Sequence, residues 1–335
     1  MRCIACYKMA TGDFMNLQIY LKLSAFLRSL PVIHKIVWKI RKKTYAVQRI
    51  FIVRRAVIDA APHLMAAIST SAPYAAGKMG SVESAALYAY LKRKKARNKG
   101  LSPKAYKEHI FHNLHMNAGV FPKEEVNFDA FAEAYLDAVK QCDMLVSWDV
   151  AGEPRILAEY AKNSVLVKFR TLEPFFSDSP WSALLADKRV LVISPFVQSI
   201  SEQYAFRKDL WKNPALLPSF ELLTVRAPLS AALVPPVDTT WRNALERLKS
   251  EMDGISYDIA LIGAGAYSLP LAAHAKKCGK IGIHLGGSLQ FLFGVAGERW
   301  KRDAAYRGFI TDKWRKPSPV ETPPMKNAIE NGCYW

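Results

Sequence analysis

Short runs of consecutive apolar residues alternate with longer amphipathic stretches through much of this chain. The clearest runs cover residues 188–193, 257–262 and 281–285, and two further candidates cover residues 144–148 and 220–225. Runs rich in Val, Ile and Leu, without strict alternation of polar residues, are typical of strands buried on both faces. The five runs therefore predict a sheet that is covered by helices on both sides.

The segment between two of these runs indicates how the strands are oriented. Residues 257–262 lead into a Gly-Ala-Gly turn at 263–265, a helix follows through Lys277, and residues 281–285 form the next strand. This order is a βαβ crossover, which joins parallel strands. We therefore expect an α/β fold, a three-layer sandwich with a mainly parallel, Rossmann-like sheet. Further helices are expected over residues 81–91, 199–208 and 241–252.

The first sixty residues differ from the rest in pattern and in charge. Apolar side chains recur at near-helical spacing over residues 14–58, interrupted at Pro31, with basic residues nearby. Residues 1–58 hold twelve Lys or Arg against one acid, Asp13, whereas the whole chain holds 47 against 29, a net charge of +18. We therefore divide the chain into a basic amphipathic helical segment, residues 1–60, and an α/β domain, residues 61–335.

Two interpretations of the basic segment remain open. A helix with Leu, Ile, Phe and Trp on one side and Lys or Arg on the other is typical of an anionic membrane surface. The same pattern also fits an ordinary helix that packs on the body and turns its basic face to solvent. Our hypothesis is that residues 14–58 hold the protein on the inner face of the cytoplasmic membrane.

Other destinations for the chain are less favoured. The basic run at residues 92–99 closes a helix, and no aromatic-interleaved pattern accompanies it, so nucleic acid is not an expected partner. No run of about 18 uncharged apolar residues is present, and charges interrupt each candidate core of a signal peptide. We therefore expect a cytoplasmic protein that is at most peripheral on the membrane.

The five cysteines do not indicate a structural framework. Cys3 and Cys6 form a C-x-x-C, whereas Cys142, Cys278 and Cys333 are scattered and have no His-rich spacing. A disulfide framework would need more cysteines, and a zinc site would need a second closely spaced pair. The sequence therefore predicts reduced thiols.

Loops rich in Gly and Ser follow three of the predicted strands. They contain Ser194, Gly263 with Gly265, and Gly286 with Gly287. Parallel sheets bind ligands beyond the carboxyl ends of their strands, where glycine lets the backbone approach a ligand and helix N-termini attract anions. The three loops therefore predict a site for a phosphate-bearing ligand, although each glycine pair also fits a tight turn.

Several familiar nucleotide and hydrolase motifs are missing. The turn at 263–265 lacks the third glycine of the dinucleotide fingerprint, and His284 stands where an acidic residue would bind a ribose. NAD binding is therefore disfavoured. Neither a P-loop nor a G-x-S-x-G elbow occurs, so P-loop NTPases and serine hydrolases of that type are set aside.

Several motifs in the second half of the chain resemble a known family. They are Ile-Gly-Ala-Gly-Ala-Tyr at 262–267, His-Leu-Gly-Gly at 284–287, Phe-Gly at 293–294, Arg-Trp at 299–300 and Gly-Cys-Tyr-Trp at 332–335. These motifs are similar to those of bacterial proteins with a GT-D-type glycosyltransferase fold, which occur in surface-polysaccharide settings. The resemblance covers roughly residues 65–335, and it implies transfer of a sugar from a nucleotide-diphosphate donor to a glycan or lipid-linked acceptor.

The resemblance also implies a metal-handling motif, which this chain only partly keeps. GT-D-type enzymes carry Asp-x-Glu, and the corresponding stretch here has Ser81 in the first acidic position and Glu83 in the second. One carboxylate is a weak ligand set for Mg²⁺ or Mn²⁺, so the resemblance leaves the metal at Glu83 open. Asp149, which follows the run at 144–148, stands at a strand end, and Glu83 or Asp149 is the expected general base.

The expected substrate-binding residues combine the motif residues with the strand-end loops. They are Lys78, Gly80, Ser81, Asn117, Ser194, Gly263, Gly265, Tyr267, His284, Gly286, Gly287 and Gln290. The loss of the first acid motivates a second interpretation, a non-catalytic nucleotide-sugar or polysaccharide-binding protein on a degenerate glycosyltransferase fold. A nucleoside phosphorylase, which shares such a glycine-loop sheet, is a third and less favoured interpretation.

Overall fold

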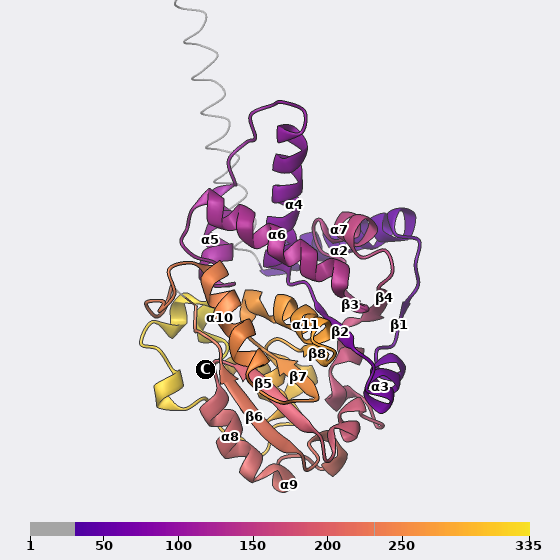
Figure 1. The fold of residues 1–335 in the computed structure, drawn as a ribbon, viewed down its shortest axis with the longest axis vertical. Helices are drawn as coiled ribbons and strands as arrows, with labels where there is room; N and C mark the ends of the chain where they lie inside the picture. The colour runs from indigo at the N-terminus through magenta and orange to yellow at the C-terminus, as the bar shows by residue number, and fades with distance from the viewer. Residues whose placement is uncertain (1–30, 231) are drawn as a thin grey trace, which may run out of the picture.

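A computed structural model describes residues 31–230 and 232–335 as an α/β fold around one sheet of eight parallel strands (Figure 1). The strands lie in the order β1-β4-β3-β2-β8-β7-β5-β6. Their bounds are β1 Val57–Ile58, β2 Tyr74–Lys78, β3 Met144–Ser147, β4 Val165–Lys168, β5 Arg189–Ser194, β6 Glu221–Arg226, β7 Ile259–Ile262 and β8 Ile281–His284. The predicted three-layer sandwich with a parallel, Rossmann-like sheet is confirmed.

Helices cover both faces of this sheet (Figure 1). The helices of eight or more residues are α2 Pro31–Ile52, α3 Ala61–Thr70, α4 Ser81–Arg97, α5 Glu108–Met116, α6 Glu125–Gln141, α7 Glu153–Tyr160, α8 Val197–Ala205, α10 Trp241–Asp253 and α11 Ser268–Lys277. The shorter ones are α9 Arg207–Leu210, α12 Ser288–Leu292, α13 Glu298–Arg302 and α14 Ala304–Arg307. Helices α6, α10 and α11 pack on one face, and α3 and α8 lie on the other.

The strands divide their side chains between two hydrophobic cores. In β5, Leu191 and Ile193 face the core that α6, α10 and α11 share, whereas Val190 and Val192 face the opposite core. Successive side chains of a strand point to opposite faces, so a strand between two helical layers has to be apolar at every position. This requirement explains why the apolar runs marked the strands in the sequence.

Two halves of the sheet meet where β2 pairs with β8. Strands β1 to β4 come from residues 57–168 and strands β5 to β8 from residues 189–284, and Ala76 pairs with Ile283 across the junction. A side chain at Gly77 would place its Cβ 2.7 Å from the Cβ of His284, so glycine is required for this approach. Ligands bind at such a junction in open parallel sheets, beyond the carboxyl ends of the strands.

Several elements differ from their predicted extents. Helix α4 continues through the basic run to Arg97, and the helix expected over 199–208 is divided into α8 and α9. Strands β1, β2 and β4 were not predicted, and β2, Tyr-Ala-Ala-Gly-Lys, contains no β-branched residue. Neighbouring strands and helices, not local propensity, therefore hold β2 in the centre of the sheet.

The described part of the basic segment contains helix α2 and the short strand β1, which belongs to the sheet. Helix α2 packs against α7, and Arg49 forms an ion pair of 2.9 Å with Asp149. The apolar stripe predicted over residues 14–30 lies outside the described residues. Within residues 31–230 and 232–335, no helix combines the length and the apolar character needed to cross a bilayer.

Candidate functional site

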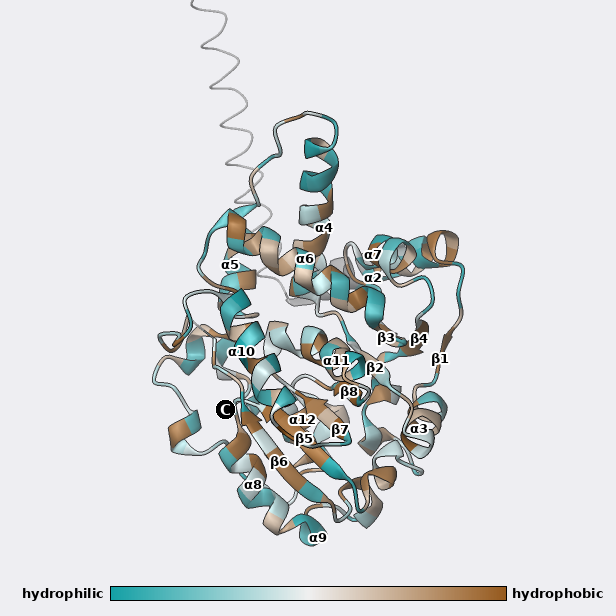
Figure 2. Cartoon of the chain, in the orientation of Figure 1, coloured by the Kyte–Doolittle hydropathy of each residue, from teal (hydrophilic) through white to brown (hydrophobic). Residues whose placement is uncertain are grey.

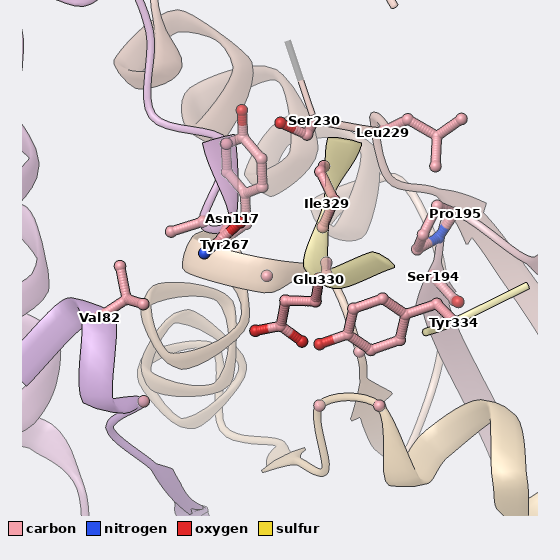
Figure 3. Close-up of a pocket in the computed structure, with 18 of the residues that line it drawn as sticks. Val82, Asn117, Ser194, Pro195, Leu229, Ser230, Tyr267, Ile329, Glu330 and Tyr334 are labelled. Carbon is pink, nitrogen blue, oxygen red and sulfur yellow. The ribbon is translucent and has the colours of Figure 1, made fainter. Parts of the chain in front are cut away.

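A cavity of about 280 Å³ lies beyond the carboxyl ends of the central strands. Its floor is formed at the carboxyl ends of β2, β8, β7 and β5 by Lys78, His284, Gly263 and Ser194. Ile329, Glu330 and Tyr334, from the end of the chain, close one side (Figure 3). The cavity therefore lies over the junction between the two halves of the sheet, where the topology predicts a ligand site.

The structure brings together in this cavity nearly every residue that the sequence had marked. The predicted residues that line it are Lys78, Gly80, Ser81, Glu83, Asn117, Ser194, Gly263, Gly265, Tyr267, His284, Gly286, Gly287 and Gln290. Asp149 is the exception and is not part of the lining. Further lining residues that were not predicted as site residues include Trp148, Ser230, Arg299, Ile329, Glu330 and Tyr334.

Lys78 is a buried cation at the floor of the cavity. Its side chain ends β2 with 7 % exposure, and its Nζ lies 4.6 Å from the ring centre of Phe169 and 4.0 Å from a carboxylate oxygen of Glu173. Burial lowers the pKa of Lys78 to about 8, although Glu173 opposes the shift. Within the described residues its ammonium donates no hydrogen bond, so its donors are available to an anionic ligand in the cavity.

His284 organises the next loop as a neutral side chain. Burial, reinforced by the charge of Lys78, lowers the pKa of His284 to about 3, so the imidazole is uncharged at physiological pH. Its Nδ1 accepts a hydrogen bond of 3.1 Å from the backbone N–H of Gly286. Gly286 has φ +61°, and a side chain at Gly263 would meet its carbonyl oxygen at 2.6 Å. These two glycines therefore allow two loops to meet directly at the floor.

The N-terminus of α8 is already occupied by a carboxylate from within the chain. The buried side chain of Glu321 accepts hydrogen bonds from the backbone N–H groups of Gln198, at 2.7 Å, and Ser199, at 3.2 Å. An anion at this helix N-terminus is what the helix dipole favours. The loop at Ser194 therefore does not offer α8 to a ligand, which leaves Lys78 and the glycine loops as the candidates for binding an anion.

Glu83 and Glu330, which are far apart in the sequence, both line the cavity. Glu83 lies in the first turn of α4, where its carboxylate folds back over Gly80 and accepts a hydrogen bond from its own backbone N–H. Burial raises the pKa of Glu83, and the nearby charge of Glu330 raises it further. A second acid therefore lies close to Glu83, although it is not the one that the family motif places at position 81.

Glu330 is exposed at the mouth of the cavity. Figure 3 shows its carboxylate turned toward the phenol of Tyr334, with Ile329 on the same segment. Its backbone has φ +45°, an uncommon value for a residue other than glycine. No local pattern in the sequence pointed to Glu330, and the Gly-Cys-Tyr-Trp motif two residues later was the only nearby signal.

Asp149 follows β3 as expected, but its side chain contacts Arg49 and does not line the cavity. Its backbone has φ +57°, its N–H donates to Glu153 at 2.7 Å, and its carboxylate pairs with Arg49 of α2. The neighbouring Trp148 lines the cavity instead. In this arrangement Asp149 joins α2 to the α/β body, while β3 contributes an aromatic wall to the site.

The cavity offers a partial ligand set for a divalent cation. Mg²⁺ in phosphate-binding sites is held by one or two carboxylates together with substrate phosphates and water. Glu83 provides one carboxylate in the lining of the cavity. One carboxylate, completed by a diphosphate and water, would meet this requirement.

Comparisons with protein-family models, with curated proteins and with solved structures find no match to this chain. The resemblance to GT-D-type proteins therefore rests on the motif residues themselves. Residues from four of those motifs line the cavity, namely Gly263, Gly265 and Tyr267, then His284, Gly286 and Gly287, then Arg299, and finally Tyr334 with Trp335. Motifs that are distant in sequence thus contribute to a single site.

Proposed function

We propose that this chain is a glycosyltransferase that uses a nucleotide-diphosphate sugar in cell-surface polysaccharide biosynthesis. The observation that carries the proposal is Lys78, a buried ammonium without a hydrogen bond among the described residues, at the floor of a cavity lined by glycine loops. A buried cation of this kind favours an anionic group, and phosphate is the anion that glycine loops at strand ends accommodate. The resemblance to GT-D-type proteins is the reason for proposing a sugar attached to this phosphate.

The proposed reaction exchanges one bond for another at the anomeric carbon. An acceptor hydroxyl forms the new C–O bond, the bond from the sugar to the diphosphate breaks, and its electron pair leaves on the diphosphate. Lys78 and the backbone N–H groups of Gly265 and Gly287 would stabilise that charge, since fixed donors in a partly dry site stabilise developing anions strongly. The N–H groups of Gly263, Ala264 and Gly286 already donate within the chain.

We assign proton transfer to Glu330 in place of Asp149. Glu330 is at the open mouth, where an acceptor can enter, whereas Lys78 is at the closed floor. The hydroxyl proton would pass to the Glu330 carboxylate as the new bond forms. Glu83 would hold a divalent cation where one accompanies the donor, and that cation would supply further charge neutralisation on the diphosphate.

The alternative is a non-catalytic protein that binds a nucleotide sugar or a polysaccharide. Ser81 favours it, because the first acid of the family motif is absent. Both the enzyme and a nucleotide-sugar-binding protein would bind the donor, but only the enzyme would turn it over. Sustained nucleotide release would support the enzyme, whereas binding without release in the presence of acceptor lipid would support the binding protein.

We further propose that the enzyme acts at the inner face of the cytoplasmic membrane, where a lipid-linked acceptor would present its sugar. The exposed side of α2 carries Ile40, Val47 and Phe51, which are 59 %, 50 % and 70 % exposed, and Figure 2 shows apolar residues at the end of this helix. Lys39 and Lys43 are exposed on the same helix. Apolar and basic side chains together favour an anionic lipid surface.

The test of the proposed activity is incubation with a panel of UDP-, GDP- and dTDP-sugars, with and without a lipid-linked acceptor. We expect one nucleotide class to be released, and release to increase with acceptor. Thermal shift with the same panel reports binding independently of turnover. Failure of every donor to bind would overturn the enzyme proposal and the nucleotide-sugar form of the binding-protein proposal.

A further inference from the structure

Three potential metal ligands meet at the amino ends of the strands, at the opposite end of the strands from the cavity. Asp253 is the last residue of α10, His274 lies in the last turn of α11, and Cys278 caps α11. The carboxylate of Asp253 and the thiol of Cys278 are exposed, and His274 is half-buried. Both helices end just before a strand, α10 before β7 and α11 before β8, so the cluster lies at the amino ends of these strands.

The spacing of the two helical ligands has a simple origin. Residues four apart on a helix lie on the same face, one turn from each other. His274 and Cys278 have this spacing, and Asp253 reaches them from the neighbouring helix. The sequence therefore contained the His-x-x-x-Cys part of the cluster, but only the packing of α10 on α11 supplies the acid.

The distances between the ligand atoms agree with a tetrahedral ion. Zn²⁺ binds sulfur at about 2.3 Å and nitrogen or oxygen at about 2.0–2.2 Å, so tetrahedral geometry separates sulfur from either by about 3.5 Å. Here Sγ of Cys278 lies 3.5 Å from Oδ1 of Asp253 and 3.6 Å from Nε2 of His274. The Nε2 and Oδ1 atoms are 2.8 Å apart, so they would separate by about 0.5 Å around an ion.

We propose that Asp253, His274 and Cys278 form a site for Zn²⁺ or a similar borderline divalent cation. Thiolate and imidazole ligands select zinc over magnesium or calcium. Because the cluster is partly exposed, water would complete the coordination. The site would clip the carboxyl end of α10 to that of α11, remote from the cavity, and it is independent of the proposed transferase activity.

Binding has a defined proton balance. The thiol of Cys278 loses its proton to solvent as the sulfur–metal bond forms, and His274 coordinates through Nε2 while its remaining proton resides on Nδ1. Burial and the carboxylate of Asp253 raise the pKa of Cys278, and the nearby charge of Lys280 opposes that shift.

Cobalt provides a direct test in the full chain. Cys3 and Cys6 are a competing pair of thiols, so they are first replaced by serine in all variants. Titration with Co²⁺ alone should then give one equivalent of tetrahedral absorption with a thiolate-to-cobalt charge-transfer band, which Zn²⁺ displaces. Cys278→Ser should abolish that band, and His274→Ala should weaken binding by more than about tenfold.

Cys333→Ser is the matched control, because Cys333 is also a free thiol but lies at the end of the chain. It should leave the cobalt spectrum and the zinc-induced rise in melting temperature unchanged. Asp253→Asn keeps the size of the side chain and should weaken binding without removing the thiolate band. A cobalt spectrum that lacks this band, or that Cys278→Ser does not change, would overturn the proposal.

Discussion

Lys78 is a buried lysine whose pKa is set by its surroundings, and this makes its proposed anion binding testable. The pKa of about 8 follows from its removal from water at the end of β2, which only the neighbouring carboxylate of Glu173 partly offsets. The lysine is therefore charged below about pH 8 and becomes neutral above it. An anion that binds beside it stabilises the charged form and is bound less tightly as the pH rises.

The pH dependence of anion binding follows from this shift. We expect the affinity for inorganic pyrophosphate to be highest below pH 7 to 8 and to fall as the pH rises past about 8. Lys78→Met should lower the affinity at pH 7 by about 2 kcal/mol, the scale of a hydrogen bond to a charged group. Calorimetric titration from pH 6.5 to 9.5 measures both effects.

Lys78→Arg is the control for the pH effect, because arginine stays charged throughout this range. Its affinity for pyrophosphate should not follow the same titration. Lys78→Met removes one buried charge but leaves the buried carboxylate of Glu173 without its nearby cation, so thermal unfolding is measured beside binding to show that the variant is folded. If the wild type and Lys78→Arg showed the same pH profile, another group would be responsible for the dependence.

Glu330 and Glu83 provide the second residue-scale prediction. If Glu330 accepts the acceptor proton, Glu330→Gln should lower turnover by about 100-fold or more while donor binding is retained. Removing its negative charge should also lower the pKa of Glu83, because Glu330 is one of the causes of the raised value. Nucleotide release measures the turnover, and calorimetry measures the binding of the donor.

Glu298→Gln is a matched change on the nearby helix α13, where the acid pairs with Lys316 on the surface and does not line the cavity. It should leave turnover within about twofold, as expected for a surface substitution. Equal activity of Glu330→Gln and the parent would remove Glu330 from the mechanism.

Residue patterns predicted the floor of the site better than its walls. Glycine and serine loops after apolar strands can be recognised locally, so Gly263, Gly286 and Ser194 were found. Glu330 could not be found in this way, because Glu83 is far from it in sequence and only the folded tail brings the two charges near each other. Asp149 had the right local position, yet its side chain turns to Arg49, a contact that no local pattern specifies.

At the scale of elements, the last residues of the chain act as a wall of the cavity. Trp335 donates its indole N–H to the carbonyl of Glu321 at 2.8 Å, and Arg299 donates its backbone N–H to the carbonyl of Cys333 at 2.9 Å. Gly297 makes this docking possible, since a Cβ there would lie 2.3 Å from the backbone of Tyr334. The fit of this segment therefore determines the shape of the site.

Gly297→Ala should push the tail away from the cavity. The added methyl cannot be accommodated without moving backbone, and such overpacking costs about 1–3 kcal/mol. We expect a lower melting temperature and weaker donor binding, measured by thermal unfolding and calorimetry. Gly308→Ala is the control, because nothing lies within 4 Å of the position that its Cβ would take, and it should change neither quantity appreciably.

Helix α2 has one side packed on the body and one side exposed, a division that the sequence alone could not show. One side packs on α7 through contacts such as the Arg49–Asp149 pair, while Ile40, Val47 and Phe51 stay exposed on the other. A helix that packed on the body and only turned a basic face to solvent would not need exposed apolar residues on that face. An anionic membrane would bury them and attract the nearby lysines, each contributing about 1 kcal/mol at most.

The triple variant Ile40→Ser, Val47→Ser, Phe51→Ser tests this role while keeping Arg49 and the contacts with α7. It should lose most of its sedimentation with vesicles rich in anionic lipid, and the wild type should release from them as salt is raised. Leu101→Ser with Val126→Ser removes exposed apolar residues elsewhere and should bind normally. Equal sedimentation of the triple variant and the wild type, or binding indifferent to lipid charge, would contradict the proposal.

At the scale of the whole molecule, the site exists because two halves of one sheet meet. The continuous apolar runs predicted β5, β7 and β8, since strands buried on both faces have to be apolar throughout. The same rule missed β2, whose small residues fit between β3 and β8 and let Gly77 approach His284. Fold class was therefore predictable from patterns, whereas the junction that positions Lys78 depended on tertiary packing.

The central claim is that the cavity at this junction binds a nucleotide-diphosphate sugar through Lys78. Calorimetric titration of the UDP-, GDP- and dTDP-sugar panel into the wild type and Lys78→Met, at pH 7, tests it most directly. We expect one donor class to bind the wild type with a stoichiometry of one, and its affinity to be lower by more than about tenfold in Lys78→Met. Absence of binding by every donor, or equal affinity of the two proteins for the donor that binds, would contradict it.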